Sequence, residues 1–304
     1  MPYNYGVETI NADIATPNIP KPMYWQPLVW LAGLILLTVG LAFMPVPNRL
    51  VQALGALFIT IIYVALILGF VVSATRHSRL RALLIGANIS VFCWMLFRFL
   101  PWHFLPSFII RNALTDAALT SSAVFLGALV ARPLIRTPNM IGPICGIIAL
   151  IDIWGVMFGG IVAQLLAKAP DVASRAMTHG PAVGTATKSI YTISLPSVGI
   201  GDYLFLGILF AALSIHQLNV RGAWRWVWPL MTVPLLAVMF GITEIFGIPG
   251  LPGLLFIGLG VAIPNRKYFQ YTREEKFALL YAAIFVVILT VGLYFMLMSM
   301  LVAK

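Results

Sequence analysis

Apolar stretches of about 20 residues recur along almost the whole chain, and they constrain its fold more than any other feature. They lack the alternation of polar and apolar residues that a membrane β-strand needs. Because lipid cannot bond backbone N–H and C=O groups, such stretches cross a membrane as helices. Only 9% of the 304 residues are charged and 61% are hydrophobic, which is too apolar for a soluble surface. The sequence therefore predicts an all-α polytopic membrane protein.

We expect about nine transmembrane helices, in one transmembrane domain over residues 24–304. Their approximate limits are Tyr24–Met44, Leu50–Ala74, Ala82–Phe97, Ala113–Ala131, Met140–Leu166, Ser197–Leu218, Trp226–Phe246, Pro249–Ile263 and Phe277–Val302. The eighth is short and proline-rich, and Pro101–Asn112 fits either a loop or a re-entrant or interfacial piece. Residues 1–23 form a polar tail that lacks the pattern of a cleavable signal peptide, so we expect the tail to be retained.

The basic residues predict an orientation for this domain. With nine spans, 12 of the 19 Lys and Arg residues fall on one face and 7 on the other; the larger set is Lys21, Arg76, Arg79, Arg81, Arg132, Arg136, Arg221, Arg225, Arg266, Lys267, Arg273 and Lys276. The positive-inside rule then predicts a multi-pass protein of the plasma (inner) membrane with a cytoplasmic N-terminus and an external loop between Ala167 and Pro196. The clusters lie at span ends, so the net charge of +10 indicates membrane lipids as partners and no nucleic acid.

Four of the nine acidic residues fall within apolar spans, where each costs at least about 2.5 kcal/mol to insert. Asp152 shares a helical face with Gly155 and Gly159, which allows another helix to approach closely. Asp202 shares its face with Gly199 and follows Gly201, so the backbone beside this carboxyl group is open. The other two acids are Asp116, near the start of its span and beside Thr115, and Glu244, near the end of the helix before Pro249. We expect Asp116 to snorkel or to cap its helix, and we leave both out of the catalytic set.

Three motifs in order resemble the GxGD intramembrane aspartyl proteases, the presenilin and signal peptide peptidase families. They are Ile151-Asp152 ahead of the glycine face, Gly199-Ile200-Gly201-Asp202, and Pro249-Gly250-Leu251-Pro252. The resemblance covers roughly Ile141 to Ile263 and indicates a prokaryotic-type homologue with a catalytic core at about residues 140–264. The family has Tyr-Asp at the first motif and Pro-Ala-Leu at the third, to which Pro249-Gly250-Leu251 or the overlapping Pro252-Gly253-Leu254 corresponds. The family also places five spans before the first Asp, whereas this chain has four.

The resemblance implies an enzyme that hydrolyses peptide bonds within transmembrane segments or remnant signal peptides. Asp152 and Asp202, on two adjacent helices, would be catalytic, and Gly199, Gly201, Pro249, Gly250, Leu251 and Pro252 would bind substrate. Two carboxyl groups that share one proton can activate water and polarise a carbonyl, so no cofactor or metal is expected. The four histidines lack ligand spacing, and Cys93 and Cys145 fit as small core residues. No long insert separates the two Asp helices, so we expect a self-sufficient enzyme without obligatory partner subunits.

Two further expectations concern geometry. Lys188–Leu195 alternates polar and apolar residues, which fits either an ordinary amphipathic loop or a strand that pairs with an unwound substrate. Straight helices would place Asp152 and Asp202 at different depths, so we expect the helix of Asp152 to end or bend near Gly159-Gly160.

Other functions fit parts of the pattern. A proton-coupled or ion-coupled secondary transporter also uses buried carboxylates and broken helices, but the chain shows no inverted repeat. A prepilin-peptidase-like enzyme shares GxGD, although Tyr203-Leu204-Phe205 lacks the lysine that typically follows it. A scaffold whose acids are only structural would tolerate replacement of Asp152 and Asp202.

Overall fold

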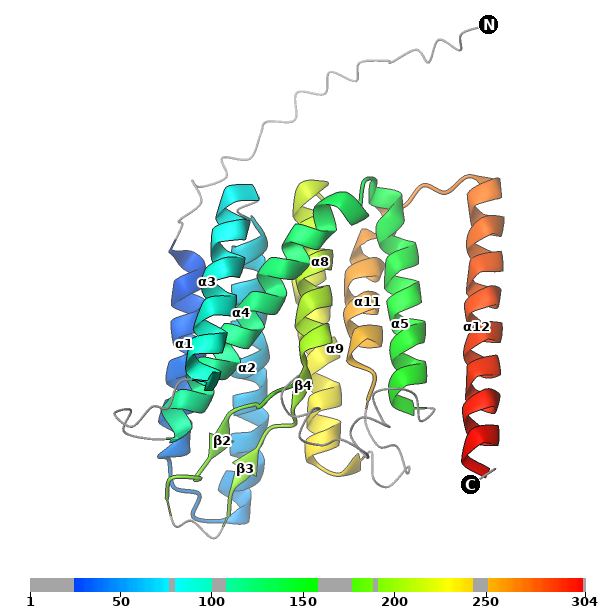
Figure 1. Ribbon diagram of the computed structural model, residues 1–304. Helices are drawn as coiled ribbons and strands as arrows, with labels where there is room; N and C mark the ends of the chain where they lie inside the picture. Colours follow the sequence, from blue (N-terminus) through cyan, green and yellow to red (C-terminus); the bar gives the residue numbers. More distant parts are fainter. Residues whose placement is uncertain are drawn as a thin grey trace, which may run out of the picture.

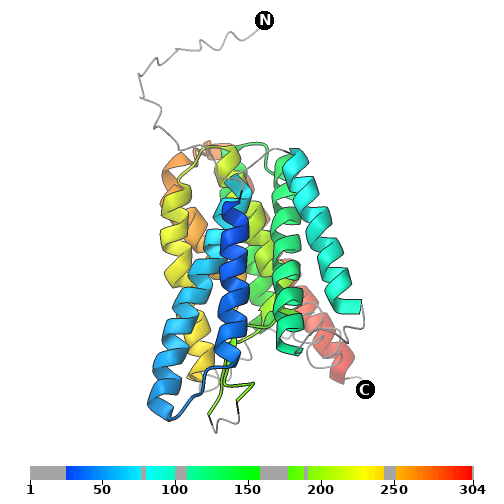
Figure 2. The same cartoon turned by 90° about the vertical axis from the view of Figure 1, so that its left-hand side faces the viewer.

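The structure is a computed structural model that describes residues 25–76, 80–99, 108–157, 177–187, 191–242 and 251–302. Within these ranges nine α-helices stand side by side with their axes roughly parallel (Figures 1 and 2). The all-α class predicted from the sequence is confirmed. Each of these helices coincides with one of the nine predicted spans.

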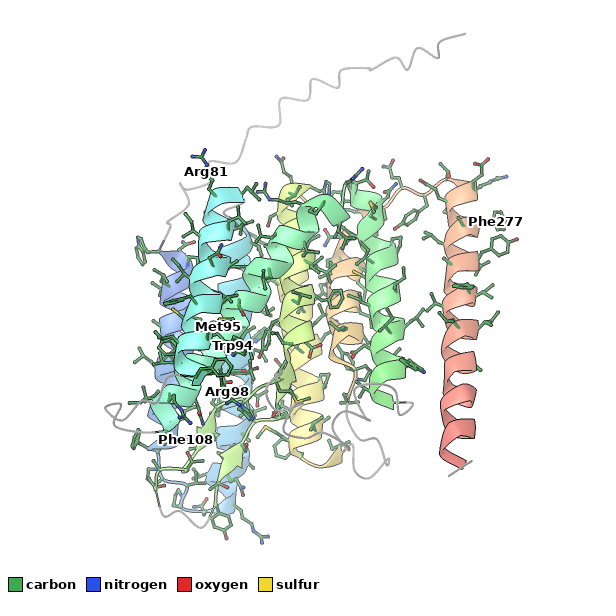
Figure 3. The ribbon with its side chains drawn as sticks, in the orientation of Figure 1. Arg81, Trp94, Met95, Arg98, Phe108 and Phe277 are labelled. Atoms are coloured by element: carbon green, nitrogen blue, oxygen red, sulfur yellow. The ribbon has the colours of Figure 1, made fainter. Side chains whose placement is uncertain are left out.

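The first half of the bundle consists of four helices: α1 (Gln26–Ala42), α2 (Arg49–Arg76), α3 (Leu80–Phe99) and α4 (Phe108–Leu134). Arg81 and Arg98 lie toward opposite ends of α3 (Figure 3). Three of these helices, α2, α3 and α4, are long and apolar enough to cross a membrane, as is the stretch Pro138–Val156. The shorter apolar helices are Gln26–Ala42 and Ile200–Ile215.

The second half carries the predicted motifs. Its helices are α5 (Ile141–Met157), α8 (Ile200–Ile215), α9 (Val220–Met239), α11 (Gly253–Asn265) and α12 (Arg273–Val302), with short 3-10 turns η1 (Pro138–Met140) and η2 (Arg266–Tyr268). The core is centred on α8, where Tyr203, Leu206, Leu209 and Phe210 are fully buried. This helix packs against α4, α2 and α11. The GxGD sequence therefore leads into the middle of the bundle.

Two small antiparallel strand pairs precede α8. β1 (Met177–Thr178) pairs with β4 (Val198–Gly199), and β2 (Ala182–Val183) pairs with β3 (Ile193–Ser194). Of the loop and strand alternatives for Lys188–Leu195, the structure has a two-residue strand at Ile193–Ser194, which pairs with β2, while residues 188–190 lie outside the described ranges. Gly199 belongs both to β4 and to the start of α8, so the strand pair holds the entry to the Asp202 helix.

Large apolar side chains cover the outside of the bundle. Leu36, Phe92 and Phe285 are 64–70% exposed, and their helices contribute many more exposed Leu, Ile and Phe residues. A continuous apolar exterior of this kind would aggregate in water and is the surface that helices present to lipid. The exposed apolar side chains and the long apolar helices are both compatible with a lipid environment.

Glycines allow the helices next to the site to approach closely. A side chain at Gly127 of α4 would collide with the carbonyl oxygen of Leu204 in α8. In α11, a Cβ at Gly258 would lie 3.0 Å from the backbone oxygen of Cys145 in α5, and one at Gly260 would lie 2.8 Å from Cα of Val227 in α9. Small residues at such contacts let backbones pack directly. Gly258 and Gly260 therefore let α11 pack closely against α5 on one side and against α9 on the other.

Several predicted limits were wrong. α4 begins at Phe108, five residues before the predicted span. Of the segment Pro101–Asn112, residues 108–112 are therefore helical, and residues 101–107 lie outside the described ranges. α9 begins at Val220 and includes Arg221 and Arg225. Hydropathy marks where apolar side chains begin, whereas backbone hydrogen bonding continues into the polar residues beyond them. The bend predicted at Gly159-Gly160 lies outside the described residues.

Candidate functional site

Asp152 lies near the last described turn of α5 and points at the first turn of α11. Its Oδ2 accepts a hydrogen bond of 2.8 Å from the backbone N–H of Leu254, and the residue is half-buried. Leu254 is the second residue of α11, where backbone N–H groups have no partner within their own helix. The Asp152 side chain of α5 therefore caps the N-terminus of α11.

Asp202 is the third residue of α8 and folds back on the start of that helix. Gly199 is the N-cap residue, and a Cβ at this position would lie 3.7 Å from Asp202 Oδ2, so the carboxyl group lies beside the cap. The third position of a helix is where an acid can reach back to the cap residue. The local sequence Gly-x-Gly-Asp thus fixes the Asp202 side chain at the head of α8, beside the strand pair β1–β4.

The two carboxyl groups meet at the N-terminus of α11. A Cβ at Gly253 would lie 3.0 Å from Oδ1 and 3.2 Å from Oδ2 of Asp202, so the Gly253 backbone lies against this carboxyl group. The backbone N–H of the next residue, Leu254, donates to Asp152. The α11 N-terminus therefore brings together carboxyl groups that lie 50 residues apart in the sequence.

The prediction of two adjacent helices needs correction on one point. α5 packs mainly against α11 and α12, and α8 against α4, α2 and α11, so α11 joins the two Asp helices. With α11 between them, the acids lie at one level because both reach the same helix end.

The predicted substrate residues fall into two groups. Among the described residues, nothing lies within 4 Å of a Cβ at Gly201, and a Cβ at Gly199 would meet only Asp202 Oδ2, at 3.7 Å. Within the described part of the chain, no other residue therefore approaches the backbone beside Asp202. Leu251 and Pro252 lead directly into α11, while Pro249 and Gly250 lie outside the described ranges. In the overlapping register of the third motif, Gly253 and Leu254 of Pro252-Gly253-Leu254 contact the two acids.

Sequence reasoning left Gly253 and Leu254 out of the site. The signal that could have found them is the helix start that Pro252 marks, because the free N–H groups there attract carboxylates. It also missed Tyr203, whose buried hydroxyl contacts the Tyr63 hydroxyl at 3.1 Å and accepts a hydrogen bond of 3.0 Å from Thr178. This buried network ties β1 and α2 to the residue that follows Asp202.

Asp116 has a partner that the sequence did not indicate. Its Oδ1 lies 3.8 Å from Nδ1 of His179, in the connection after β1. Because α4 starts at Phe108, Asp116 lies in the third turn of the helix, and the prediction that it caps the helix was wrong. The Asp116 carboxylate raises the pKa of His179, and partial burial and Arg98 oppose this effect. Glu244 lies outside the described residues.

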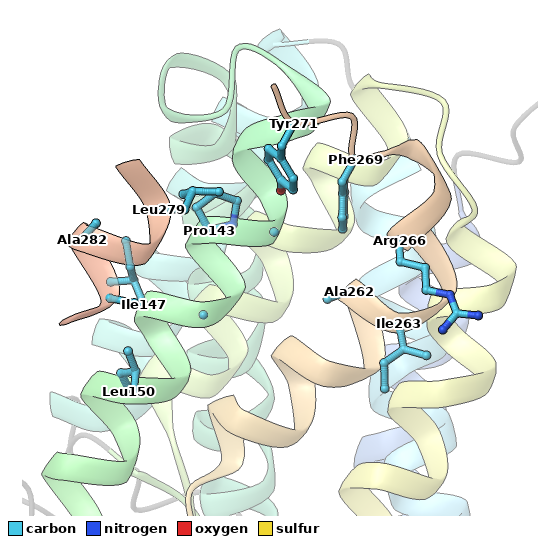
Figure 4. Close-up of a pocket in the computed structure, with 13 residues that line it drawn as sticks. Pro143, Ile147, Leu150, Ala262, Ile263, Arg266, Phe269, Tyr271, Leu279 and Ala282 are labelled. Atoms are coloured by element: carbon cyan, nitrogen blue, oxygen red, sulfur yellow. The ribbon is translucent and has the colours of Figure 1, made fainter. Parts of the chain in front are cut away.

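A crevice lies away from Asp152 and Asp202. It has a volume of about 430 Å³, lies between α5, α11 and α12, and is lined mostly by apolar side chains. Arg266 and Tyr271 also line it (Figure 4). It lies at the other end of α11 from Gly253. Within the described residues no group of three or more His, Cys, Asp or Glu residues has the arrangement of a metal site.

The fold and the site define a class: an all-α bundle with an apolar exterior and two carboxyl groups that meet at one helix N-terminus. No family model matches the chain, and neither a curated protein nor a solved structure matches it.

Proposed function

We propose that the chain is a polytopic membrane protein of about nine spans and an intramembrane aspartyl protease with Asp152 and Asp202 as its catalytic pair. The observation that carries the proposal is the convergence of both carboxyl groups on Gly253 and Leu254, beside the open backbone of Gly199 and Gly201. The order and spacing of the three motifs, which resemble the GxGD proteases, support the same function.

The chemistry follows from two close carboxyl groups that share one proton. The ionised group takes a proton from a water whose oxygen bonds to the scissile carbonyl carbon, while the protonated group donates to the carbonyl oxygen. The amide nitrogen then gains a proton and the C–N bond breaks, which yields a carboxyl and an amine end. The Leu254 N–H would hold the Asp152 side chain in place during these transfers, and the Gly253 backbone would limit the movement of the Asp202 carboxyl group.

A substrate helix has to unwind before this attack, and its freed backbone then needs hydrogen-bond partners. β3 and β4 lie just before Asp202, and each is paired within its two-stranded sheet on one side only. An extended substrate could pair with such an edge, which is how strand addition binds peptides. The open side of Gly201 would let the peptide backbone come close to Asp202.

The test is cleavage of a synthetic transmembrane peptide by the purified chain in detergent. We expect wild type to cleave the peptide, and Asp152→Asn and Asp202→Asn each to lower the rate by at least about 10³-fold, because the two groups act as a unit. The matched control is Asp116→Asn, which changes the same chemical group in another helix and should stay within about threefold of wild type.

The variants should melt close to the wild-type temperature, which separates lost chemistry from lost folding. Equal losses in all three variants, or cleavage that survives in Asp202→Asn, would contradict the proposal. The alternative, a proton- or ion-coupled transporter, predicts instead that wild type cleaves nothing and that reconstituted vesicles show uptake dependent on Asp152 and Asp202.

A further inference from the structure

A crevice of about 550 Å³ lies between α1, α2 and α9, remote from Asp152 and Asp202. It is found where α1 and α9 begin and α2 ends, the end of the bundle opposite the α11 N-terminus (Figure 1). Its lining combines three arginines with three tryptophans: Arg76, Arg221, Arg225, Trp25, Trp30 and Trp224. The rest of the lining is mostly small or apolar.

The arginines give the crevice a charge that the described part of the chain does not neutralise. All three are exposed, and no described carboxylate lies within ion-pair distance of them. Arg221 and Arg225 also occupy the first two turns of α9, where the helix dipole favours acids over bases. The crevice therefore presents positive charge that an anion could compensate.

The tryptophans make the walls of the crevice rigid. The Trp30 ring lies flat on the α2 backbone, since a Cβ at Gly69 would come within 2.6 Å of it. Trp224 stacks on Trp228 with ring centroids 5.6 Å apart, and Trp228 Nε1 donates to the Ile61 carbonyl at 3.2 Å. Aromatic residues of this kind concentrate where a membrane meets water. The crevice is therefore formed before any ligand arrives.

We propose that this crevice binds an anionic phospholipid, with the headgroup phosphate on the three guanidinium groups and an acyl chain along the apolar floor. Guanidinium groups match phosphate oxygens in charge and geometry, and Val29 and Val72 line the part between α1 and α2. A soluble anion would leave this apolar part uncovered, and a zwitterionic headgroup would leave the positive charge uncompensated. The proposal requires the bundle to lie in a membrane but does not depend on the proteolytic activity.

The test is native mass spectrometry of the purified full-length chain with phosphatidylglycerol, phosphatidylcholine or glycerol phosphate. At about 1 kcal/mol per arginine near an anionic headgroup, we expect wild type to retain one phosphatidylglycerol, and R76Q/R221Q/R225Q to need at least about tenfold more lipid. The control is R81Q/R136Q/R273Q, which removes three exposed arginines from the same predicted face outside the crevice and should stay within about twofold of wild type.

Three outcomes would overturn the proposal. Equal losses in the two triple variants would mean that only the general charge of this face attracts lipid. Equal retention of phosphatidylglycerol and phosphatidylcholine by wild type would remove the headgroup from the argument. Displacement by glycerol phosphate at millimolar concentration would identify a site for soluble anions. Arg225→Gln alone, with unchanged thermal melting, should already weaken retention severalfold, so misfolding of the triple variant would not rescue the proposal.

Discussion

Gly253 is the residue at which the fold leaves the least room beside Asp202. A valine there would place two methyl groups where a single Cβ already approaches Asp202 Oδ1 to 3.0 Å. We expect Gly253→Val to displace the carboxyl group and to lower peptide cleavage by about 10²-fold, since misplacement of about 1 Å costs this much. The rate should be measured with thermal melting on the same sample.

The control for this change is Gly146→Val, which adds the same side chain to α5 where nothing lies within 4 Å. It should lower stability slightly, through the poorer helix propensity of valine, without a comparable loss of cleavage. Equal rates for Gly253→Val and wild type would show that Asp202 does not need its position against α11.

His179 and Asp116 predict a pH dependence of stability. Because the Asp116 carboxylate raises the folded-state pKa of His179, the pair stabilises fully below the unfolded value of about 6.5, and this is lost as pH rises through the folded pKa. The effect is at most about 1 kcal/mol because the imidazole is largely exposed. Melting temperatures between pH 5 and 8 should show that Asp116→Asn destabilises more at pH 5 than at pH 8. In a His179→Gln background this difference should vanish.

Part of the site could be predicted at this scale. Asp152 and Asp202 were selected because an acid is costly in an apolar span and because glycines share their helical faces. The Gly253 and Leu254 contacts depend on how α11 is wedged between its neighbours, which no local pattern shows. The Asp116–His179 pair joins a helix to a connection far along the chain, so neither residue indicates the other.

At the scale of elements, α11 is held at its far end by a pair of asparagines. The fully buried Asn265 accepts a hydrogen bond of 2.9 Å from the Asn219 N–H through Oδ1 and donates to the Val261 carbonyl at 2.9 Å. Asn219 in turn caps α9 by accepting from the Gly222 N–H at 2.8 Å. The end of α11 and the start of α9 are therefore joined by one chain of hydrogen bonds.

We expect Asn265→Ala to lower the free energy of unfolding by about 1–3 kcal/mol, because it leaves the Asn219 N–H without its acceptor. Thermal unfolding in detergent measures this. Asn88→Ala is the matched control, since the exposed Asn88 amide bonds only Leu84 of its own helix. If the two variants melt at the same temperature, the hydrogen bonds of Asn265 stabilise the fold no more than those of an exposed asparagine.

The existence of the helices was predictable, whereas their ends were not. Apolar length alone located each of the nine helices, because a span must satisfy its backbone internally. Arg111 lies in the first turn of α4, and Arg221 and Arg225 lie in the first two turns of α9. A hydropathy pattern leaves such charged residues out of a predicted span, although the helical backbone includes them. The pairing of β1 with β4 was not predictable, because two-residue strands carry no period.

At the scale of the whole molecule, the bundle has two chemically different ends. One end carries Arg76 at the end of α2, Arg221 and Arg225 at the start of α9, and the start of α12, and the other carries the α11 N-terminus with its two carboxyl groups. Arg81 and Phe277 mark the first end in Figure 3. The predicted orientation places that end in the cytoplasm, so the β-strand pairs before α8 would face the outside.

This orientation can be tested by labelling single cysteines with a membrane-impermeant maleimide. The background replaces Cys93 and Cys145 by serine and alanine, and the two reporters are Ser194→Cys in β3 and Arg273→Cys at the start of α12, both at exposed residues. Because basic residues are retained on the cytoplasmic side, Ser194→Cys should react in intact cells and Arg273→Cys only after permeabilisation. The cysteine-free background should remain unlabelled. The opposite pattern would reverse the orientation and place the open side of Asp202 toward substrates that enter from the cytoplasmic face. Reaction of both reporters in intact cells would mean that no membrane separates the two positions.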